Sequence, residues 1–171
     1  AAADRGIMSE PRRRWKAPLL IAAAVGAADQ LTKHWAVNEL SDGEPIELFW
    51  TLQFNLAFNS GMAFSRGTGF GPIIAVVATL VIVWLLSTLR GTNTKTGAAG
   101  MGLVIGGAAG NLIDRLFRGD GVLDGAVVDF IDFQWFPIFN IADIAINVGA
   151  GLLILNAILV GRRDALEAAP S

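Results

Sequence analysis

Four long apolar segments alternate with polar stretches along the chain. They occupy residues 17–37, 70–89, 97–117 and 141–160, and each has roughly the 20 residues that a helix needs to cross the hydrocarbon core of a bilayer. Pro72 lies in the first turn of the second segment, where a helix tolerates proline. The pattern predicts an all-α membrane protein with four transmembrane helices.

A shorter pattern occurs between the first two segments. Residues 38–69 are first polar and then aromatic, and parts of 46–58 alternate as short strands do. Asn59, Ser60 and Gly61 then give a turn signal. We expect a small β element on the membrane surface with its aromatic side chains at headgroup level. An ordinary interfacial loop is the simpler alternative.

The ends of the chain are expected to lie outside this arrangement. Residues 1–7, ahead of Met8, have the composition of an expression scar. A single membrane domain is expected over residues 8–163. The short, Ala-rich residues 164–171 are expected to form a disordered tail.

Composition and charge support a membrane location and give an orientation. Hydrophobic residues make up 53% of the chain and charged residues 16%, with a mean hydropathy of +0.53, which is more apolar than a soluble globular domain. Basic residues gather at one side of the four-helix arrangement: Arg12, Arg13, Arg14, Lys16, Arg90, Lys95, Arg162 and Arg163. Acidic residues predominate at the other side, where Arg66 and Arg118 are the exceptions. The positive-inside rule predicts cytoplasmic termini and two extracytoplasmic segments.

The first apolar segment contains two opposite charges. Asp29 and Lys33 are four residues apart, so they share a helix face and can pair. One interpretation is a lysine that extends to the interface together with its counter-ion. The other is a polar wall of a site near the outer surface. The sequence leaves both open.

The third apolar segment combines small residues with a polar end. Gly102, Gly106 and Gly110 recur every four residues, a spacing that lets helices approach closely in lipid. The last turns carry one polar face, formed by Asn111, Asp114, Arg115 and Arg118. A solvated helix end would explain this face. The amide of Asn111, however, lies far enough into the apolar run to need a partner.

Residues 127–143 carry the candidate chemistry. We interpret Asp129 as lying on an irregular approach to the fourth helix, and Asp143 about one turn inside it, where a charge is costly and often functional. Two nearby aspartates in a poorly solvated site tend to share a proton. One can then accept a proton from water while the other donates to a carbonyl oxygen. This chemistry hydrolyses an amide without a metal, a thiol or a histidine.

Local sequence suggests how the two carboxylates differ. Asn140 is a natural N-cap, which places Asp143 at the third helical position, where free N–H groups and the helix dipole favour the ionised form. We therefore hypothesise that Asp143 is the more easily ionised member of a coupled pair and that Asp129 more often carries the proton. For Asp124, Asp129 or Asp132 taken alone, a solvated acidic loop is the simpler interpretation.

Other chemistries find little support. The chain has no cysteine and one histidine, His34, so a thiol nucleophile and a Ser-His-Asp triad are hard to build. Ser60 and Ser65 have no histidine or lysine nearby in the sequence, and the zinc-binding helix motif His-Glu-x-x-His is absent. The remaining alternative is a non-enzymatic membrane protein, such as a small transporter or a lipid-binding assembly factor, which also uses buried charges.

Five ordered blocks make the chain resemble a known family, lipoprotein signal peptidase, also called signal peptidase II. The blocks are residues 29–33, 59–65, 106–115, 127–130 and 139–143. The resemblance covers nearly the whole chain from the first apolar segment to the fourth. One departure is the stretch 118–126, which is longer than the family's usual link to the fourth block.

The resemblance implies both a fold and an activity. The fold is a four-helix membrane bundle with a small extracytoplasmic sheet, the cradle, and a short outer helix. The activity is that of a bacterial inner-membrane aspartyl endopeptidase, which removes the signal peptide from diacylglyceryl-modified prolipoproteins on the amino side of the lipidated cysteine. The resemblance also implies contact with membrane lipid, inhibition by the cyclic peptide globomycin and a site towards the outer leaflet.

The resemblance carries over residue by residue. The catalytic pair falls on Asp129 and Asp143, and Asp114 corresponds to structural support near Arg115. The positions that line the site are Asp29, Lys33, Asn59, Asn111, Arg115 and Asn140. We expect a monomer that needs no cofactor, metal ion or nucleic-acid partner.

Overall fold

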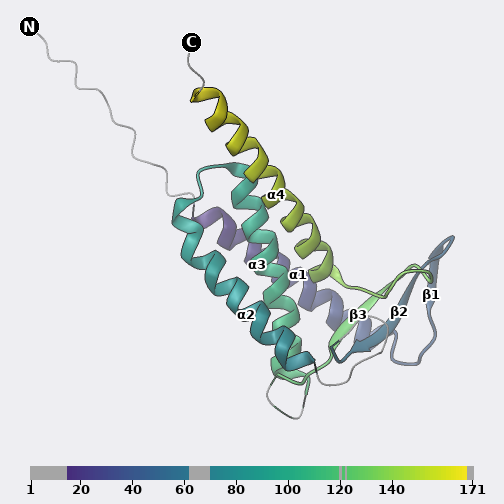
Figure 1. The fold of residues 1–171 in the computed structure, drawn as a ribbon. Helices are drawn as coiled ribbons and strands as arrows, with labels where there is room; N and C mark the ends of the chain where they lie inside the picture. Colours follow the sequence, from purple (N-terminus) through teal and green to yellow (C-terminus); the bar gives the residue numbers. More distant parts are fainter. Residues whose placement is uncertain (1–14, 62–69, 120, 122, 169–171) are drawn as a thin grey trace, which may run out of the picture.

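The computed structural model describes residues 15–61, 70–119, 121 and 123–168. This part of the chain holds four α-helices, a short 3-10 helix and one antiparallel sheet (Figure 1). The helices are α1 (Lys16–Glu39), α2 (Gly71–Thr88), α3 (Lys95–Phe117) and α4 (Ile141–Glu167), with η2 (Leu89–Gly91) following α2. The helices form a bundle, and the sheet extends from one end of it (Figure 1).

The four long apolar segments all form helices, as predicted. Within the described residues, α2, α3 and α4 are long and apolar enough to cross a membrane. Helix α1 has 24 residues but does not reach that apolarity, and it contains Asp29 and Lys33. Only a small share of the most apolar stretch of α2, and of that of α4, is buried inside the protein. Their outer surfaces therefore suit contact with lipid.

The sheet has three strands: β1 (Ile46–Phe49), β2 (Leu52–Asn59) and β3 (Val127–Asp132), in the order β1-β2-β3. The expected strands within 46–58 are confirmed as β1 and β2. The interpretation of Asp129 as part of an irregular approach is wrong, because it lies on β3, opposite Ala57 of β2. This strand pairs with a segment about 70 residues earlier, so a local pattern does not reveal it.

One other expectation differs from the structure. Helix α4 continues to Glu167, where Arg163 Nε contacts Glu167 Oε1 at 2.8 Å, so residues 164–167 of the predicted disordered tail are helical. Ala-rich sequence favours a helix. Between β3 and α4, residues 133–139 make an aromatic turn, with Gln134 at a φ of 66°. The short outer helix, to which the sequence assigns no position, stays a prediction. Residues 1–7, 62–69 and 169–171 lie outside the described residues.

Helix α3 lies against its neighbours through its glycines. A Cβ atom at Gly102 would come within 2.7 Å of Ile21 Cβ on α1, and one at Gly106 within 2.7 Å of the Ala22 carbonyl oxygen. Gly107 meets α4 in the same way, at the Ala142 carbonyl. The predicted small-residue contact is confirmed. It brings α1 and α4 close to the C-terminal half of α3, where the polar residues lie.

An aromatic cluster anchors the sheet to α1. The rings of Trp35 on α1, Phe54 on β2 and Phe130 on β3 lie 5.1 to 6.1 Å apart, mostly edge to face. Val128 and Phe130 belong to the same buried cluster, together with Leu40. This packing holds β3 over the end of α1. It fixes the neighbouring Asp129 on the opposite face of the strand, because side chains alternate along a strand.

Candidate active site

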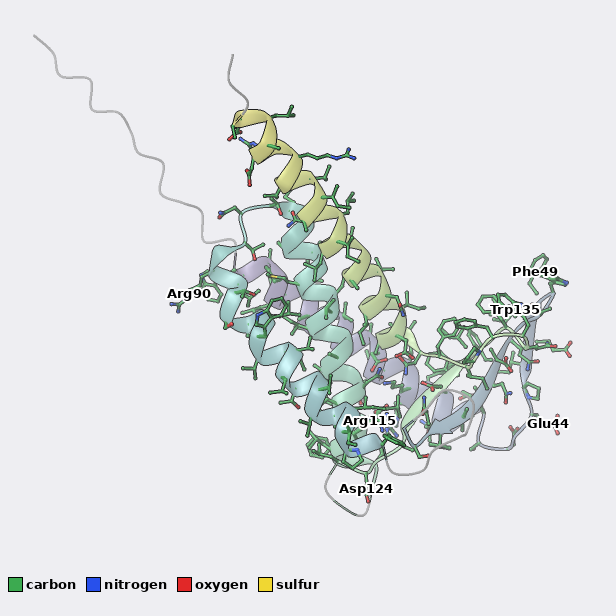
Figure 2. The ribbon with its side chains drawn as sticks, in the orientation of Figure 1. Glu44, Phe49, Arg90, Arg115, Asp124 and Trp135 are labelled. Atoms are coloured by element: carbon green, nitrogen blue, oxygen red, sulfur yellow. The ribbon has the colours of Figure 1, made fainter. Side chains whose placement is uncertain are left out.

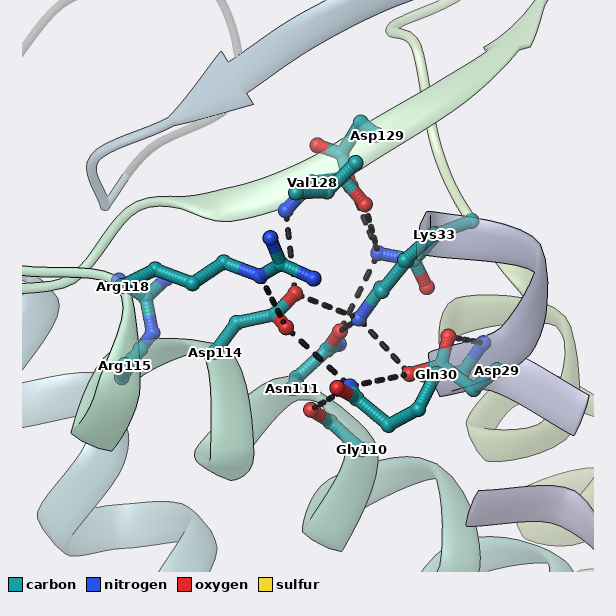
Figure 3. Close-up of polar contacts among 12 residues, drawn as sticks. Asp29, Gln30, Lys33, Gly110, Asn111, Asp114, Arg115, Arg118, Val128 and Asp129 are labelled. Carbon is teal, nitrogen blue, oxygen red and sulfur yellow. Dashed lines mark hydrogen bonds and ion pairs between the residues drawn. The ribbon is translucent and has the colours of Figure 1, made fainter. Parts of the chain in front are cut away.

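Asp129 and Asp143 come together where β3 meets the start of α4. Asp129 is 3% exposed, and Asp143 is half-buried in the first turn of α4. The C-terminal halves of α1 and α3 complete the surroundings (Figure 3). Sequence reasoning paired these two carboxylates, and the structure places them in one hydrogen-bond network.

Asn140 connects the two carboxylates. It caps α4, with Oδ1 accepting from the Asp143 backbone N–H at 2.9 Å while Asp143 Oδ2 accepts from the Asn140 backbone N–H at 3.2 Å. Its Nδ2 donates to Asp129 Oδ1 at 2.6 Å. The predicted N-cap is confirmed. Because Asn140 is fully buried, its amide sets the relative positions of both aspartates.

The environment of Asp129 favours its protonated form. Burial, reinforced by the negative charge of Asp143, raises the pKa of the Asp129 carboxyl from 3.8 to about 7. Hydrogen bonds from Asn59 and Asn140 oppose this shift without cancelling it. Asn59 Nδ2 donates to Asp129 Oδ2 at 3.1 Å, and Asn59 Oδ1 accepts from the Gly61 N–H at 3.0 Å. A carboxyl with such a pKa can carry a proton at neutral pH.

Lys33 belongs to a buried network that reaches Asp143 through Asn111. Its Nζ contacts Asp29 Oδ2 at 2.8 Å, Asp114 Oδ2 at 2.9 Å and Asn111 Oδ1 at 2.8 Å (Figure 3). The predicted pair of Asp29 and Lys33 is confirmed. Both side chains are fully buried, so the interpretation of Lys33 as a lysine that reaches the interface is wrong. Asn111 continues the network, because its Nδ2 donates to Asp143 Oδ1 at 2.9 Å.

Asp29 and Asp114 link elements rather than facing an open site. Asp29 Oδ1 accepts from the Ala142 N–H at 3.0 Å, which joins α1 to the start of α4. Asp114 Oδ2 accepts from the Val128 N–H at 3.1 Å, which joins α3 to β3. Asp114 Oδ1 accepts from Arg118 Nε at 2.8 Å. The solvated helix end is thus wrong for Asp114, which is fully buried, and its ionic partners are Lys33 and Arg118.

Gln30 is a contributor that sequence reasoning missed. Its Nε2 donates to Asp114 Oδ1 at 3.1 Å and to the Gly110 carbonyl at 3.1 Å (Figure 3). Its position between Asp29 and Lys33 within an apolar segment was the available signal, because an amide in such a segment needs a partner.

Arg115 is buried without a carboxylate in contact. It is 4% exposed, and its Nη1 donates to the Gly125 carbonyl at 3.4 Å. Its charge is attracted by Asp129, Asp114 and Asp143, yet no ion pair within 4.0 Å forms with any described residue. Its guanidinium therefore keeps N–H groups that a ligand could use.

Asp132 and Asp124 lie elsewhere. Although burial acts to raise it, hydrogen bonds from Asn55, Gln53 and the Gln134 backbone N–H hold the pKa of Asp132 below its ordinary value. Asp124 is exposed and accepts from the Gly121 N–H. Neither contacts the pair formed by Asp129 and Asp143. Among the described residues, no group of three or more histidines, cysteines or carboxylates is arranged to hold a metal ion.

This fold and this site define a helical membrane protein with two aspartates linked by one asparagine at one end of its bundle. The family model for signal peptidase (SPase) II matches residues 21–159. The chain therefore belongs to the signal peptidase II family, and the family resemblance seen in its sequence is confirmed.

Individual relatives agree with this assignment. The chain is 39% identical over 170 residues to a lipoprotein signal peptidase of Mycolicibacterium smegmatis, which covers 95% of this chain and 72% of the relative. It is 40% identical over 162 residues to the lipoprotein signal peptidase of Mycobacterium tuberculosis, covering 91% and 80%. A solved structure of a bacterial membrane enzyme superimposes with a TM-score of 0.74 at 26% identity, over 90% of this chain and 92% of the other.

Proposed function

We propose that this protein is an aspartic endopeptidase that removes the signal peptide from diacylglyceryl-modified prolipoproteins, on the amino side of the lipidated cysteine. Family membership supports the substrate class. The observation that carries the catalytic assignment is Asn140, which hydrogen-bonds to both Asp129 and Asp143 and holds them in one buried site.

The two aspartates divide the proton transfers between them. Asp143 is the base that accepts a proton from the attacking water, because the start of α4 favours a carboxylate and Asn111 donates to it. Asp129 donates its proton to the oxygen of the scissile carbonyl, in keeping with a pKa of about 7. When the tetrahedral intermediate collapses, the C–N bond breaks, the proton now on Asp143 passes to the leaving amine, and a hydroxyl of the intermediate returns its proton to Asp129.

Asn59, Asn111 and Arg115 are the candidates to hold the substrate. Arg115 has N–H groups without a carboxylate partner among the described residues, and these suit the carbonyl oxygens of a peptide or a lipid ester. Lys33 and Asp29 were expected to line the site, but their buried contacts support a structural part instead. Globomycin is expected to inhibit by occupying the same site.

The proposed orientation places the site at the outer leaflet. Arg90 lies at the end of the bundle away from Arg115 and the sheet (Figure 2), and the other basic link residue, Lys95, follows it closely in the chain. The positive-inside rule then assigns the Arg90 end to the cytoplasm. In this orientation α1 is a fourth span, both termini are cytoplasmic, and the protein works as a monomer in the inner membrane.

A cleavage assay tests the proposal. Purified protein in detergent is given a diacylglyceryl-modified prolipoprotein, and the product is followed as a shift on a gel. Wild type and the control Asp132→Asn are expected to cleave it, whereas Asp129→Asn and Asp143→Asn are expected to lose activity by at least about 100-fold. Cleavage that survives in either of the last two variants would show that the wrong carboxylates are paired. No cleavage by folded wild type would favour the transporter or assembly-factor alternative.

A further inference from the structure

Lys33 is a buried cation that the proposed chemistry does not use. An ammonium group has three N–H donors and no acceptor. The Lys33 Nζ has three partners, Asp29, Asp114 and Asn111, at 2.8 to 2.9 Å. No N–H group is left for a substrate. Apart from the attraction between its charge and Asp129, any effect of Lys33 on the reaction must therefore pass through one of these neighbours.

Asn111 is the neighbour that reaches the aspartates. A side-chain amide has an acceptor oxygen at one end and a donor NH2 at the other. Asn111 Oδ1 accepts from Lys33 Nζ at 2.8 Å and from Asn140 Nδ2 at 3.1 Å, while its Nδ2 donates to Asp143 Oδ1 at 2.9 Å. If the amide turned over, its NH2 would face an ammonium and a second NH2, and its oxygen would face a carboxylate.

We propose that Lys33 is a positioning residue that fixes the orientation of the Asn111 amide and so guarantees an N–H donor for the Asp143 carboxylate. This inference rests on the proposed function, in which Asp143 accepts the proton of the attacking water. A donor stabilises an ionised carboxylate, whereas an acceptor in the same place would destabilise it. Lys33 thus keeps Asp143 in its reactive form without touching the substrate.

The Asn140 amide, which donates to Asp129, is also oriented by a donor. The Asp143 backbone N–H can only donate, and it holds Asn140 Oδ1 at 2.9 Å. This contact leaves Asn140 Nδ2 to donate to Asp129 at 2.6 Å and to Asn111 at 3.1 Å. Both aspartates therefore receive an amide N–H whose direction is set by a donor on the far side of the amide. Lys33 orients the Asn111 amide, and the Asp143 backbone N–H orients the Asn140 amide.

The first test places an acceptor where Asp143 now finds a donor. Asn111→Asp keeps an oxygen for Lys33, so the buried network stays satisfied and the protein is expected to fold. The acidic limb of the cleavage rate is expected to move to higher pH by about one unit, since hydrogen bonds to charged groups contribute about 1.5 kcal/mol or more. Asn147→Asp adds the same charge one turn further along α4, at an exposed position, and is expected to shift the limb much less.

The second test removes Lys33. The double variant Asp29→Asn with Lys33→Met has the same net charge as wild type, and it is also compared with Asp29→Asn alone to separate the loss of Lys33 from the loss of the Asp29 charge. The amide oxygen introduced by Asp29→Asn can still accept from the Ala142 N–H. The limb is expected to shift in the double variant, and to shift no further when Asn111→Leu is added. Asp129 on β3 and Arg115 on α3, whose charges interact with Asp143, stay in place. Asp114 on α3 loses Lys33 and keeps Arg118 as its ionic partner.

Three results would overturn the inference. One is an acidic limb of the cleavage rate that lies at the same pH in Asn111→Asp as in wild type. Another is a double variant that loses thermal stability but keeps the wild-type limb, as a purely structural Lys33 would. The third is a shift that adds in full to that of Asn111→Leu, as an effect of charge alone would. Failure of the proposed function is separate, because it appears as a wild type that does not cleave the lipidated substrate, or as an active Asp129→Asn.

Discussion

At the scale of single residues, Asp129 is where burial and function oppose each other. Its carboxyl is nearly inaccessible and shares Asn140 with a second carboxylate. Ionising it means placing a second negative charge in a poorly solvated site. The raised pKa that results is useful to a proton donor and costly to the folded state, so it leads to one prediction about rate and one about stability.

The rate of cleavage should fall as the pH rises through about 7. Asp129 must carry a proton to donate it, and its carboxyl has a pKa of about 7. The measurement is kcat for a diacylglyceryl-modified substrate between roughly pH 5 and pH 9. A rate that keeps rising through this range would contradict the assignment of Asp129 as the acid.

Asp129→Asn should stabilise the protein at higher pH relative to wild type. Because the folded pKa is raised from 3.8 to about 7, the stability that protonated Asp129 contributes is complete below about pH 4 and is lost as the pH rises through about 7. Asparagine does not ionise. The melting temperature of the variant minus that of wild type should therefore increase by a few degrees between about pH 4 and pH 8. A difference that is constant with pH would contradict it.

At the scale of elements, the start of α4 combines a structural and a chemical task in Asn140. Asn140→Ser should keep the cap through its hydroxyl and lose the donor to Asp129, whereas Asn140→Ala should lose both. We expect both variants to lose most activity. Only Asn140→Ala should also lose about 1 kcal/mol of stability. Thermal melts beside the cleavage assay separate the two effects, and an active Asn140→Ser would mean that the donor is dispensable.

The contact of α3 with α1 gives a second prediction for an element. Gly106→Ala places a methyl group within 2.7 Å of the Ala22 carbonyl oxygen, and the strain should cost about 1–3 kcal/mol and lower the melting temperature. Gly151→Ala is the matched control, because a Cβ at Gly151 in α4 meets nothing within 4 Å. Equal melting temperatures for the two variants would show that the helices can separate at no cost.

The helices and the cap could be predicted from the sequence, because each depends on nearby residues. Apolar runs of membrane length gave the four helices, and Asn140 three residues before Asp143 gave the capping box. Strand β3 could not be found in this way, since its partner β2 lies far away in the chain. The burial of Lys33 was equally hidden. Its pairing with Asp29 is local, but Asp114 and Asn111 come from α3.

The pair of catalytic candidates was found by different means. Asp143 stands out because a carboxylate in an apolar helix is costly. Asp129 by itself looks like part of an acidic loop, and its assignment came from its pairing with Asp143 and from the family resemblance. The raised pKa of Asp129 depends on burial by packing and on the charge of Asp143, neither of which a local pattern contains.

At the scale of the whole molecule, the proposed orientation can be tested with single cysteines, because the chain has none of its own. The two variants are Glu44→Cys and Arg162→Cys. Glu44 lies before β1 and Arg162 near the end of α4, and both positions are exposed. A membrane-impermeant maleimide added to intact spheroplasts should label only Glu44→Cys. Labelling of Arg162→Cys before lysis would contradict cytoplasmic termini.

The buried charges between α1 and α3 have a consequence for the insertion of the protein into the membrane during synthesis. Helix α1 is synthesised first, yet it is the one that lacks the apolarity to cross a membrane unaided, and its Lys33 finds Asp114 and Asn111 only when α3 arrives. Until then two ionised groups face lipid or the insertion machinery. In the proposed topology, α1 is therefore stable as a membrane span only after α3 has been inserted, when roughly half of the remaining chain has followed it.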